Sequence, residues 1–279
     1  QQPLYNEDKT VCMVANGEIY NYQDLMRDLT NKGHTFSSNS DIEVIIHSYE
    51  QWGKRGVERF NGMFAFAIWH TKRRELYIFR DRVGMKPIYY TQTKDSFLFA
   101  SEIKSLLKHP QVARSINRDV IPEYLLFRFA AGENTLFKHI YELLPGHLLT
   151  LRDDGTFYLR EYWDFQYTEG KRSAQEYIEG FRKHFSNSVR LRLGGNRRIG
   201  IQLSGGIDSS MVTAIASHMS DSSVKTFTFG FENDRYNELR YANIIAKKFN
   251  TEHQEVIVNS NEYAEGLPQV IWYYDEPLI

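Results

Sequence analysis

The sequence is poor in cysteine, in long apolar runs and in charge of one sign. Cys12 is the only cysteine, so a disulfide cannot form within the chain, which favours a reducing cytoplasm. No apolar stretch approaches the roughly 18–20 residues that a membrane-spanning helix needs, and the polar start predicts no signal peptide. Lys and Arg total 34 against 35 for Asp and Glu, a net charge of -1. This balance argues against nucleic acid as a partner, and the missing apolar runs argue against a membrane.

What is present fits a globular protein of about two domains. The 279 residues are 42% hydrophobic and 25% charged, which supplies ample core material. The first residue is Gln1 rather than Met, and the last, Ile279, is apolar and has no tail behind it. We expect the sequence to be part of a longer chain.

The first half alternates short apolar segments with two early helices. Residues 10–15 predict a buried strand, followed by a turn at Asn16-Gly17. A helix is expected at 21–30, and Ser40 with Glu43 three residues later predicts a capping box for a second helix.

Further along, short apolar segments separated by polar turns predict an antiparallel meander, with a hairpin around Asp154-Gly155. The segments are 63–69, 75–79, 87–91 and 96–100.

A polar stretch without periodicity, 166–176, is interpreted as a linker, and beyond it strands and helices alternate. Strands are expected at 199–203, 225–231 and 254–258, with helical patterns between them. This alternation predicts a parallel sheet with helices packed on its faces.

A glycine-rich stretch, SGGIDSS, begins at Ser204 between a predicted strand and a predicted helix. The first-turn N–H groups of a helix are unpaired and the helix dipole favours negative charge there, so this is a potential anion site. Gly205 and Gly206 would let the backbone approach a phosphate closely, and Ser209 and Ser210 add hydroxyl donors. On composition alone, an ordinary turn with a helix N-cap is an equally good interpretation.

The pattern itself is more specific, although Asp208 would repel a phosphate unless a cation or N–H groups intervene. It is neither the Walker form nor the GxGxxG fingerprint. It resembles the pyrophosphate loop, SGGxDS, of ATP pyrophosphatases. That resemblance implies nucleotide contacts by Gln202 and by the backbone at Phe229 and Gly230, with the Phe229 side chain in the core.

A second resemblance covers essentially the whole chain and brings both halves together. Its motifs resemble those of glutamine-dependent asparagine synthetases, and in order they are VANGEIYNY, SDIEVI, FNGMFAFAIWH, RDRVGMKPIYY, FASEIKSLL and LLPGH. The family implies an α+β four-layer sandwich of the N-terminal-nucleophile hydrolase type over residues 1–165, a glutaminase. After the linker at 166–176, it implies an incomplete α/β parallel-sheet domain of the ATP-pyrophosphatase type over 177–279.

The same resemblance implies roles for four residues of the first half. The Asn16 side chain and the Gly17 N–H would form the oxyanion hole, and these two with Glu18 and Asp41 would bind glutamine, the last two at its amino end. The alternatives are structural: Asn-Gly is a standard turn, and an aspartate in a first helical turn suits the helix dipole.

The family's cysteine nucleophile, at the mature N-terminus, has no counterpart at Gln1. Cys12 lies in an apolar run and is expected to be structural. The family's glutamine-carboxylate arginine is also missing, and the chain stops at DEPLI, before the later synthetase motifs. We expect this chain alone not to carry out the full reaction.

The function implied is asparagine synthesis from aspartate, glutamine and ATP, with Mg²⁺ neutralising the pyrophosphate. The partners implied are these small molecules, and a homodimer is left open. Two alternatives stay open: an amidotransferase of the same family that acts on another carboxylate, such as a sugar acid or secondary metabolite, and a catalytically inactive binding or scaffold protein. No metal ligands are assigned.

Overall fold

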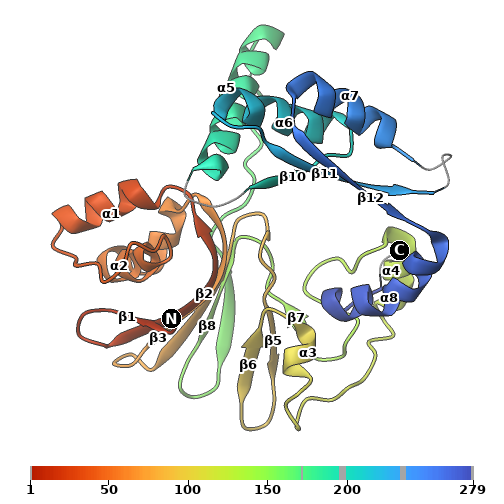
Figure 1. Cartoon of the computed structure of the whole chain (residues 1–279). Helices are drawn as coiled ribbons and strands as arrows, with labels where there is room; N and C mark the ends of the chain where they lie inside the picture. The colour runs from red at the N-terminus through yellow and green to blue at the C-terminus, as the bar shows by residue number, and fades with distance from the viewer. Residues whose placement is uncertain (1, 171, 195–198, 233–236, 278–279) are drawn as a thin grey trace. The chain divides into compact units, whose positions relative to one another are not determined.

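The computed structural model describes residues 2–170, 172–194, 199–232 and 237–277. The chain divides into two compact units: unit 1 is residues 1–167 with 271–279, and unit 2 is residues 168–270 (Figure 1). Helix α5 (Ala174–Leu193) begins inside the segment interpreted as a linker, where Ser173 forms a capping box with Glu176. The end of the chain groups with unit 1, where Lys104 forms an ion pair with Asp275 at 3.2 Å.

Unit 1 contains two antiparallel sheets. The larger has the strand order β1-β2-β3-β4-β8-β9 and the smaller β6-β5-β7. The larger sheet comprises β1 (Leu4–Tyr5), β2 (Val11–Ile19), β3 (Gly62–His70), β4 (Glu75–Arg80), β8 (His147–Leu151) and β9 (Phe157–Glu161). The smaller comprises β5 (Tyr89–Gln92), β6 (Phe97–Ala100) and β7 (Tyr141–Glu142). The predicted meander is therefore split, because β5 and β6 pair in a different sheet from β3 and β4.

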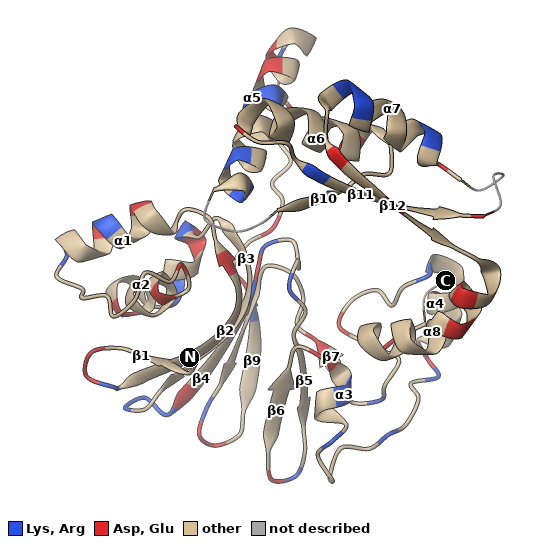
Figure 2. Cartoon of the chain, viewed as in Figure 1, with Lys and Arg blue, Asp and Glu red and all other residues tan. Residues whose placement is uncertain are grey.

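The helices of unit 1 are α1 (Tyr22–Asn31), α2 (Glu43–Trp52), the 3-10 helix η1 (Gly53–Arg59), α3 (Ile103–Leu106) and α4 (Ile121–Phe127). Ion pairs within α1, such as Asp24 with Arg27, place both charge signs side by side on its exposed surface (Figure 2). Helix α2 lacks the predicted capping box, because the Glu43 carboxylate instead accepts hydrogen bonds from Ser37 and Ser38.

Three apolar clusters stack unit 1 into four layers. The first joins α1 and α2 to one face of the larger sheet, through residues such as Leu29, Ile45 and Phe66. The second joins the opposite face of that sheet to the smaller sheet, where Ile78 and Tyr90 meet. The third joins the smaller sheet to α3. This helix–sheet–sheet–helix order confirms the predicted α+β four-layer sandwich.

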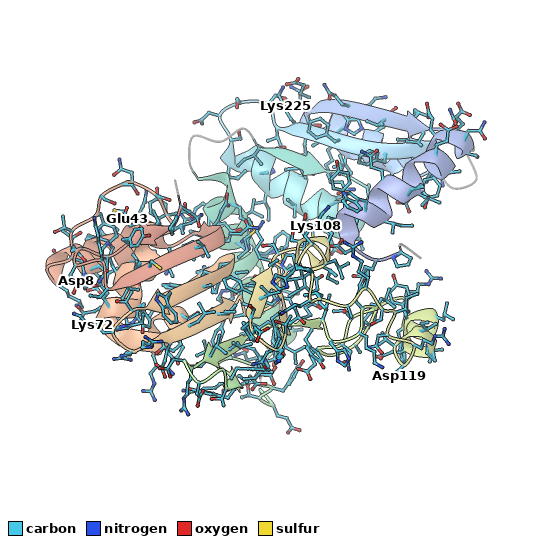
Figure 3. The ribbon with its side chains drawn as sticks, turned by 90° about the horizontal axis from the view of Figure 1, so that it is seen from below. Asp8, Glu43, Lys72, Lys108, Asp119 and Lys225 are labelled. Atoms are coloured by element: carbon cyan, nitrogen blue, oxygen red, sulfur yellow. The ribbon has the colours of Figure 1, made fainter. Side chains whose placement is uncertain are left out.

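Unit 2 contains a three-stranded parallel sheet in the order β10-β11-β12. Its strands are β10 (Gly200–Gln202), β11 (Lys225–Phe231) and β12 (Glu252–Val258), and its helices α5, α6 (Ile207–Met219) and α7 (Leu239–Phe249); α8 (Ser260–Tyr274) follows β12. Lys225, labelled in Figure 3, belongs to β11 and forms an ion pair at 3.1 Å with Glu252 of the neighbouring strand β12. The parallel α/β sheet is thus confirmed.

Helices α5, α6 and α7 cover one face of this sheet, and α8 contacts the other face, where the rings of Phe231 and Tyr263 lie 6.0 Å apart. Ile201 packs with α5 and α6, and Leu203 packs with Ala242 of α7. Because side chains alternate along a strand, Phe229 lies on the opposite face, and its side chain is 61% exposed. The expectation of a buried Phe229 side chain was therefore wrong.

No helix among the described residues is both long and apolar enough to cross a membrane.

Candidate functional sites

The predicted turn at Asn16-Gly17 is instead the continuation of strand β2, which pairs with β3 up to Ile19. Gly17 lies opposite Phe64. A Cβ on Gly17 would come within 2.2 Å of the Met63 carbonyl oxygen and 2.6 Å of the Phe64 Cα. The glycine is required because two strands approach too closely here for any side chain.

The backbone N–H and C=O groups of Gly17 point away from β3. The N–H of Phe64 donates to Asp81 Oδ2 at 3.2 Å, and the Phe64 carbonyl accepts from the Asp81 N–H at 2.8 Å. Both polar groups of Phe64 thus face β4. In an antiparallel pair, the groups of the opposite residue then face the other way. The Gly17 N–H therefore points to the outer edge of β2.

The neighbouring backbone groups on this edge already have partners. The Ala15 N–H donates to Gln2 Oε1 at 2.7 Å, and the Ile19 N–H donates to Asp41 Oδ2 at 2.9 Å. Gly17 lies between Ala15 and Ile19 on the same edge. A ligand bound there would meet a donor on a backbone that is fixed on both sides.

The four residues predicted to form this first site lie in two segments of the chain. Asn16, Gly17 and Glu18 are consecutive on β2; Asn16 is exposed and Glu18 is half-buried. Asp41 precedes helix α2 and is tied to β2 through Ile19. Side-chain alternation places Asn16 and Glu18 on the face away from α1 and α2, since Met13 and Ile19 pack against those helices.

Cys12 lies on the same strand but far from this edge site. It is four residues before Asn16, which corresponds to about 14 Å along an extended strand. It is half-buried, and burial raises the pKa of its thiol despite a hydrogen bond with Trp69 that lowers it. A half-buried thiol with a raised pKa is a poor nucleophile at neutral pH, so the structural interpretation is supported.

Sequence reasoning missed Asp81, which fixes the backbone opposite Gly17. Its carboxylate is fully buried. Besides Phe64, it accepts hydrogen bonds from the backbone N–H groups of Val83, Met85 and Lys86, at 3.2, 2.9 and 3.0 Å. The detectable signal was an aspartate directly after an apolar strand and three residues before a glycine, a turn pattern.

Arg80, beside it, was missed as well. Its buried guanidinium forms an ion pair with Glu142 at 2.7 Å and donates to the carbonyl of Leu143 at 2.6 Å. Further donations go to the carbonyls of Lys86 and Gly84. Arg80 and Asp81 together stabilise the turn after β4. Arg80 donates hydrogen bonds to backbone carbonyls, and Asp81 accepts them from backbone N–H groups.

The second site is the loop from β10 to α6 in unit 2. Leu203 is fully buried and its N–H donates to the Phe227 carbonyl at 2.8 Å, which anchors the loop to the sheet. Ser204 and Asp208 are exposed, and Gly206 is the N-cap of the 13-residue helix α6. The loop therefore presents a helix N-terminus beside short hydroxyl side chains, an arrangement that suits an anion.

Two serine hydroxyls close the loop internally. Ser204 Oγ lies 3.0 Å from Ser209 Oγ, and the Gly206 N–H donates to Ser204 Oγ at 3.3 Å. Ser209 also donates to the Gly206 carbonyl at 3.3 Å. Ser210 is the remaining serine of the motif. Its Oγ is buried and has no hydrogen-bond partner among the described residues.

The two loop glycines differ in what they require. Gly205 has φ +80, and a Cβ there would lie 2.5 Å from the backbone nitrogen of Ala242 at the start of α7. A Cβ on Gly206 would meet only Ser204 Oγ, at 3.3 Å. Gly205 is thus required by packing and backbone conformation, whereas Gly206 borders open space in which a ligand can approach.

The remaining predicted residues follow the strands of this sheet. Gln202 ends β10 and is exposed, opposite Phe227. Phe229 and Gly230 lie in β11, and Gly230 is buried against Leu239 of α7, whose Cγ would be 2.7 Å from an added Cβ. Only the exposed residues, Gln202 and Phe229, offer their side chains to a ligand.

Comparison with known proteins matches the two parts of the chain to two different families. The glutamine amidotransferase domain family matches residues 1–163, and the asparagine synthase family matches residues 180–279. The chain is 35% identical over 277 residues to asparagine synthetase [glutamine-hydrolyzing] 1 of Bacillus subtilis, over 99% of this chain and 44% of that protein. It is 33% identical over 295 residues to asparagine synthetase [glutamine-hydrolyzing] 3 of the same organism, over 99% and 48%.

A relative with a different name is almost as similar. The amidase chyE of Penicillium rubens is 30% identical over 298 residues, over 99% of this chain and 43% of that protein. The chain therefore spans somewhat less than half the length of these curated relatives. By its first 163 residues the chain belongs to the glutamine amidotransferase family, and its second part matches the asparagine synthase family.

Proposed function

We propose that the protein containing this chain makes asparagine from aspartate, glutamine and ATP. The observation that carries this proposal is the succession, on one chain, of a glutamine amidotransferase region and an asparagine synthase region. Each region contains a potential anion site made of backbone donors. Relatives named glutamine-hydrolysing asparagine synthetases, at 33–35% identity, support the same reaction.

In the first step, glutamine would be hydrolysed through an acyl-enzyme and release ammonia. The Asn16 side chain and the Gly17 N–H would stabilise the oxyanion that forms when the amide is attacked. The edge position of the Gly17 N–H supports this role, since the strand pairing holds it before the charge develops. Glu18 and Asp41 would bind the amino group of glutamine, and the bond from Ile19 holds the Asp41 carboxylate in place.

In the second step, the β-carboxylate of aspartate would attack the α-phosphorus of ATP, forming an acyl-adenylate and releasing pyrophosphate. Ammonia would then displace AMP and give asparagine. The N–H groups at the start of α6, with Ser204 and Ser209, would hold the phosphates, and Gln202 with the backbone at Phe229 and Gly230 would contact the nucleotide. The open space beside Gly206 supports this, because a side chain would fill it.

A divalent cation fits this loop as well. The exposed Asp208 carboxylate stands in the first turn of α6, where it would repel phosphate in the absence of a counter-ion. Asp208 would hold Mg²⁺, which supplies neutralisation of the pyrophosphate charge.

The test is to incubate the natural full-length protein with aspartate, ATP and Mg²⁺, adding either glutamine or ammonium. We expect asparagine, AMP and pyrophosphate in equal amounts with either nitrogen source, and glutamate only with glutamine. Formation of ADP and phosphate instead of AMP would contradict the proposal.

The alternative function is the amidation of a carboxylate other than aspartate. One observation favours it, the 30% identity to the amidase chyE over 99% of this chain. If the acceptor is not aspartate, AMP formation will stay at background with aspartate and appear with another carboxylic acid. A panel of sugar acids and amino acids in the same assay distinguishes the two functions.

A further inference from the structure

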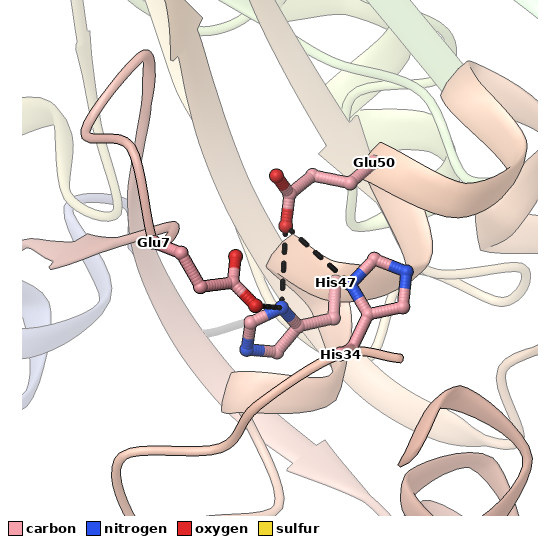
Figure 4. A group of neighbouring side chains, drawn as sticks. All are labelled: Glu7, His34, His47 and Glu50. Atoms are coloured by element: carbon pink, nitrogen blue, oxygen red, sulfur yellow. Dashed lines mark hydrogen bonds and ion pairs between the residues drawn. The ribbon is translucent and has the colours of Figure 1, made fainter. Parts of the chain in front are cut away.

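Two histidines and two glutamates converge in unit 1, away from residues 16–18. Glu7 comes from the loop between β1 and β2, His34 from the loop after α1, and His47 and Glu50 from α2 (Figure 4). One potential ligand atom of each lies within 4.8 Å of all the others. We propose that these four side chains bind a Zn²⁺-type divalent transition metal that ties the two loops to helix α2.

The spacing suits a four-coordinate ion. Bonds of about 2.0–2.1 Å at tetrahedral angles place ligand atoms about 3.3 Å apart. His47 Nδ1 lies 3.2 Å from Glu50 Oε2 and 3.6 Å from Glu7 Oε1, and His34 Nδ1 lies 3.8 Å from Glu50 Oε2. These three distances would need to change by a few tenths of an ångström, and the distances between the other pairs of ligand atoms by more, for the four atoms to surround one ion.

An outer contact orients the imidazole of His34 toward the centre of the cluster. His34 Nε2 lies 3.2 Å from Gln51 Oε1, whereas His47 Nε2 has no hydrogen-bond partner among the described residues and lies 3.7 Å from Glu43 Oε1. If Nε2 of His34 carries the proton, its Nδ1 presents its lone pair to the site. Metal-binding histidines typically have such an acceptor on the second nitrogen.

The carboxylates are oriented in the same way. Asn6 donates to Glu50 Oε1 at 2.7 Å, which leaves Oε2 as the atom that faces the histidines. The backbone N–H of Thr35 donates to Glu7 Oε1 at 3.1 Å. Each carboxylate therefore accepts one hydrogen bond before any ion binds, Glu50 through the oxygen away from the histidines and Glu7 through the oxygen that faces His47.

Charge explains why an ion would be held here. Glu7, Glu50 and Glu43 bring three carboxylates around His47, whose side chain is only 2% exposed. One N–H on Nδ1 can donate to Glu7 or to Glu50, but a dication can bind both. A dication thus neutralises more of the negative charge in this cluster than one proton does.

The ligand set indicates the class of metal and its role. Imidazole nitrogen with carboxylate oxygen suits zinc, whereas magnesium and calcium prefer oxygen alone. Four protein ligands leave no open position, which is typical of a structural site. A hollow of about 310 Å³, lined in part by Asn6 and Arg73, reaches the cluster at Glu50.

The test uses the 279-residue chain, stripped with a chelator and dialysed against Zn²⁺. Metal analysis should find one equivalent of zinc per chain, with a higher melting temperature than the chelated protein. Co²⁺ in its place should give the intense visible absorption of a tetrahedral ion with nitrogen and oxygen ligands. His34→Gln and Glu7→Gln, both at partly exposed positions, should lose the bound zinc and the stabilisation.

Two further variants sharpen the result. Gln51→Ala, which removes only the acceptor behind His34, should weaken zinc binding by about 10–100-fold. His184→Gln, at an exposed position in α5, is the matched control and should bind zinc as the unmodified chain does. If the unmodified chain retains no zinc, or if His34→Gln and Glu7→Gln retain it as His184→Gln does, the cluster is an imidazolium held by carboxylates and the proposal is wrong.

Discussion

The two potential anion sites of this chain are built from the same kind of donor but supported differently. In unit 1, the donor at Gly17 belongs to a paired strand, and buried or half-buried carboxylates at Asp81 and Asp41 bind the neighbouring backbone. In unit 2, the loop after β10 is held by hydrogen bonds between its own serines and by the packing of Gly205 on α7. The first site depends on contacts distant in sequence, whereas the second combines hydrogen bonds within a few residues with the packing of Gly205 on α7.

This difference suggests how each site works. Oxyanion stabilisation needs donors that do not reorganise while charge develops, so a donor within a paired sheet suits the glutaminase role. Phosphate binding needs several donors that converge on one group, and a helix N-terminus supplies them locally.

The largest effect is expected from the donor side chain of unit 1. Asn16→Ala in the natural full-length protein should lower glutamine hydrolysis by roughly 10²–10³ in kcat, the usual cost of one oxyanion donor. Synthesis from added ammonium should be unaffected, because that route bypasses unit 1. If both routes fall together, Asn16 is a structural residue.

The second effect concerns the carboxylate behind Gly17. Asp81→Asn places an NH₂ group among four backbone donors and should lower the free energy of unfolding by about 3 kcal/mol. The measurement is urea denaturation followed by tryptophan fluorescence, since the tryptophans at 52, 69, 163 and 272 all lie in unit 1.

Asp95→Asn is the control for this change. Asp95 is exposed and accepts from the Gln111 side chain at 2.9 Å, so its loss should cost about 0.5 kcal/mol or less. Equal effects of the two substitutions would mean that Asp81 does not support the strand opposite Gly17.

A smaller effect separates the two glycines of unit 2. Gly205→Ala should destabilise unit 2 by about 2 kcal/mol, because the new Cβ meets α7 and the residue has positive φ. Gly206→Ala should change stability by less than about 0.5 kcal/mol. Circular dichroism reports both units and tryptophan fluorescence only unit 1, so Gly205→Ala should shift the first signal alone. An equal shift for Gly205→Ala and Gly206→Ala would mean that packing does not require one glycine more than the other.

The smallest effect is expected at Cys12. Because burial raises the pKa of its thiol, alkylation by iodoacetamide near pH 7 should be slow in the folded chain and fast after denaturation. A glutamine-site label such as diazo-oxo-norleucine should leave Cys12 unmodified. An adduct on Cys12 in the folded chain, found by mass spectrometry, would identify it as a nucleophile.

The sequence predicted the parts of this structure that depend on neighbouring residues. Alternation and turn residues located the hairpin at Asp154-Gly155, and strand β11 was predicted residue for residue. The loop after Leu203 was recognisable because its donors lie within seven consecutive residues.

What the sequence did not reveal depends on contacts that the local pattern does not specify. Asn16-Gly17 reads as a turn, and only the approach of Phe64 explains the glycine inside a strand. Ser40 and Glu43 read as a capping box, but Glu43 is taken by Ser37 and Ser38 and faces His47. The exposure of Phe229 could not be predicted either, because local pattern does not say which face of a sheet is covered.

The most direct test of two separately built sites uses one substitution with two measurements. Gly206→Val in the natural full-length protein places a branched side chain beside the phosphate loop and leaves unit 1 unchanged. AMP formation and glutamine hydrolysis are measured on the same preparation, with folding checked by circular dichroism. We expect AMP formation to be abolished while glutamine hydrolysis continues at the rate of the unmodified protein. Unimpaired AMP formation would contradict this expectation, and so would a loss of both activities in a folded variant.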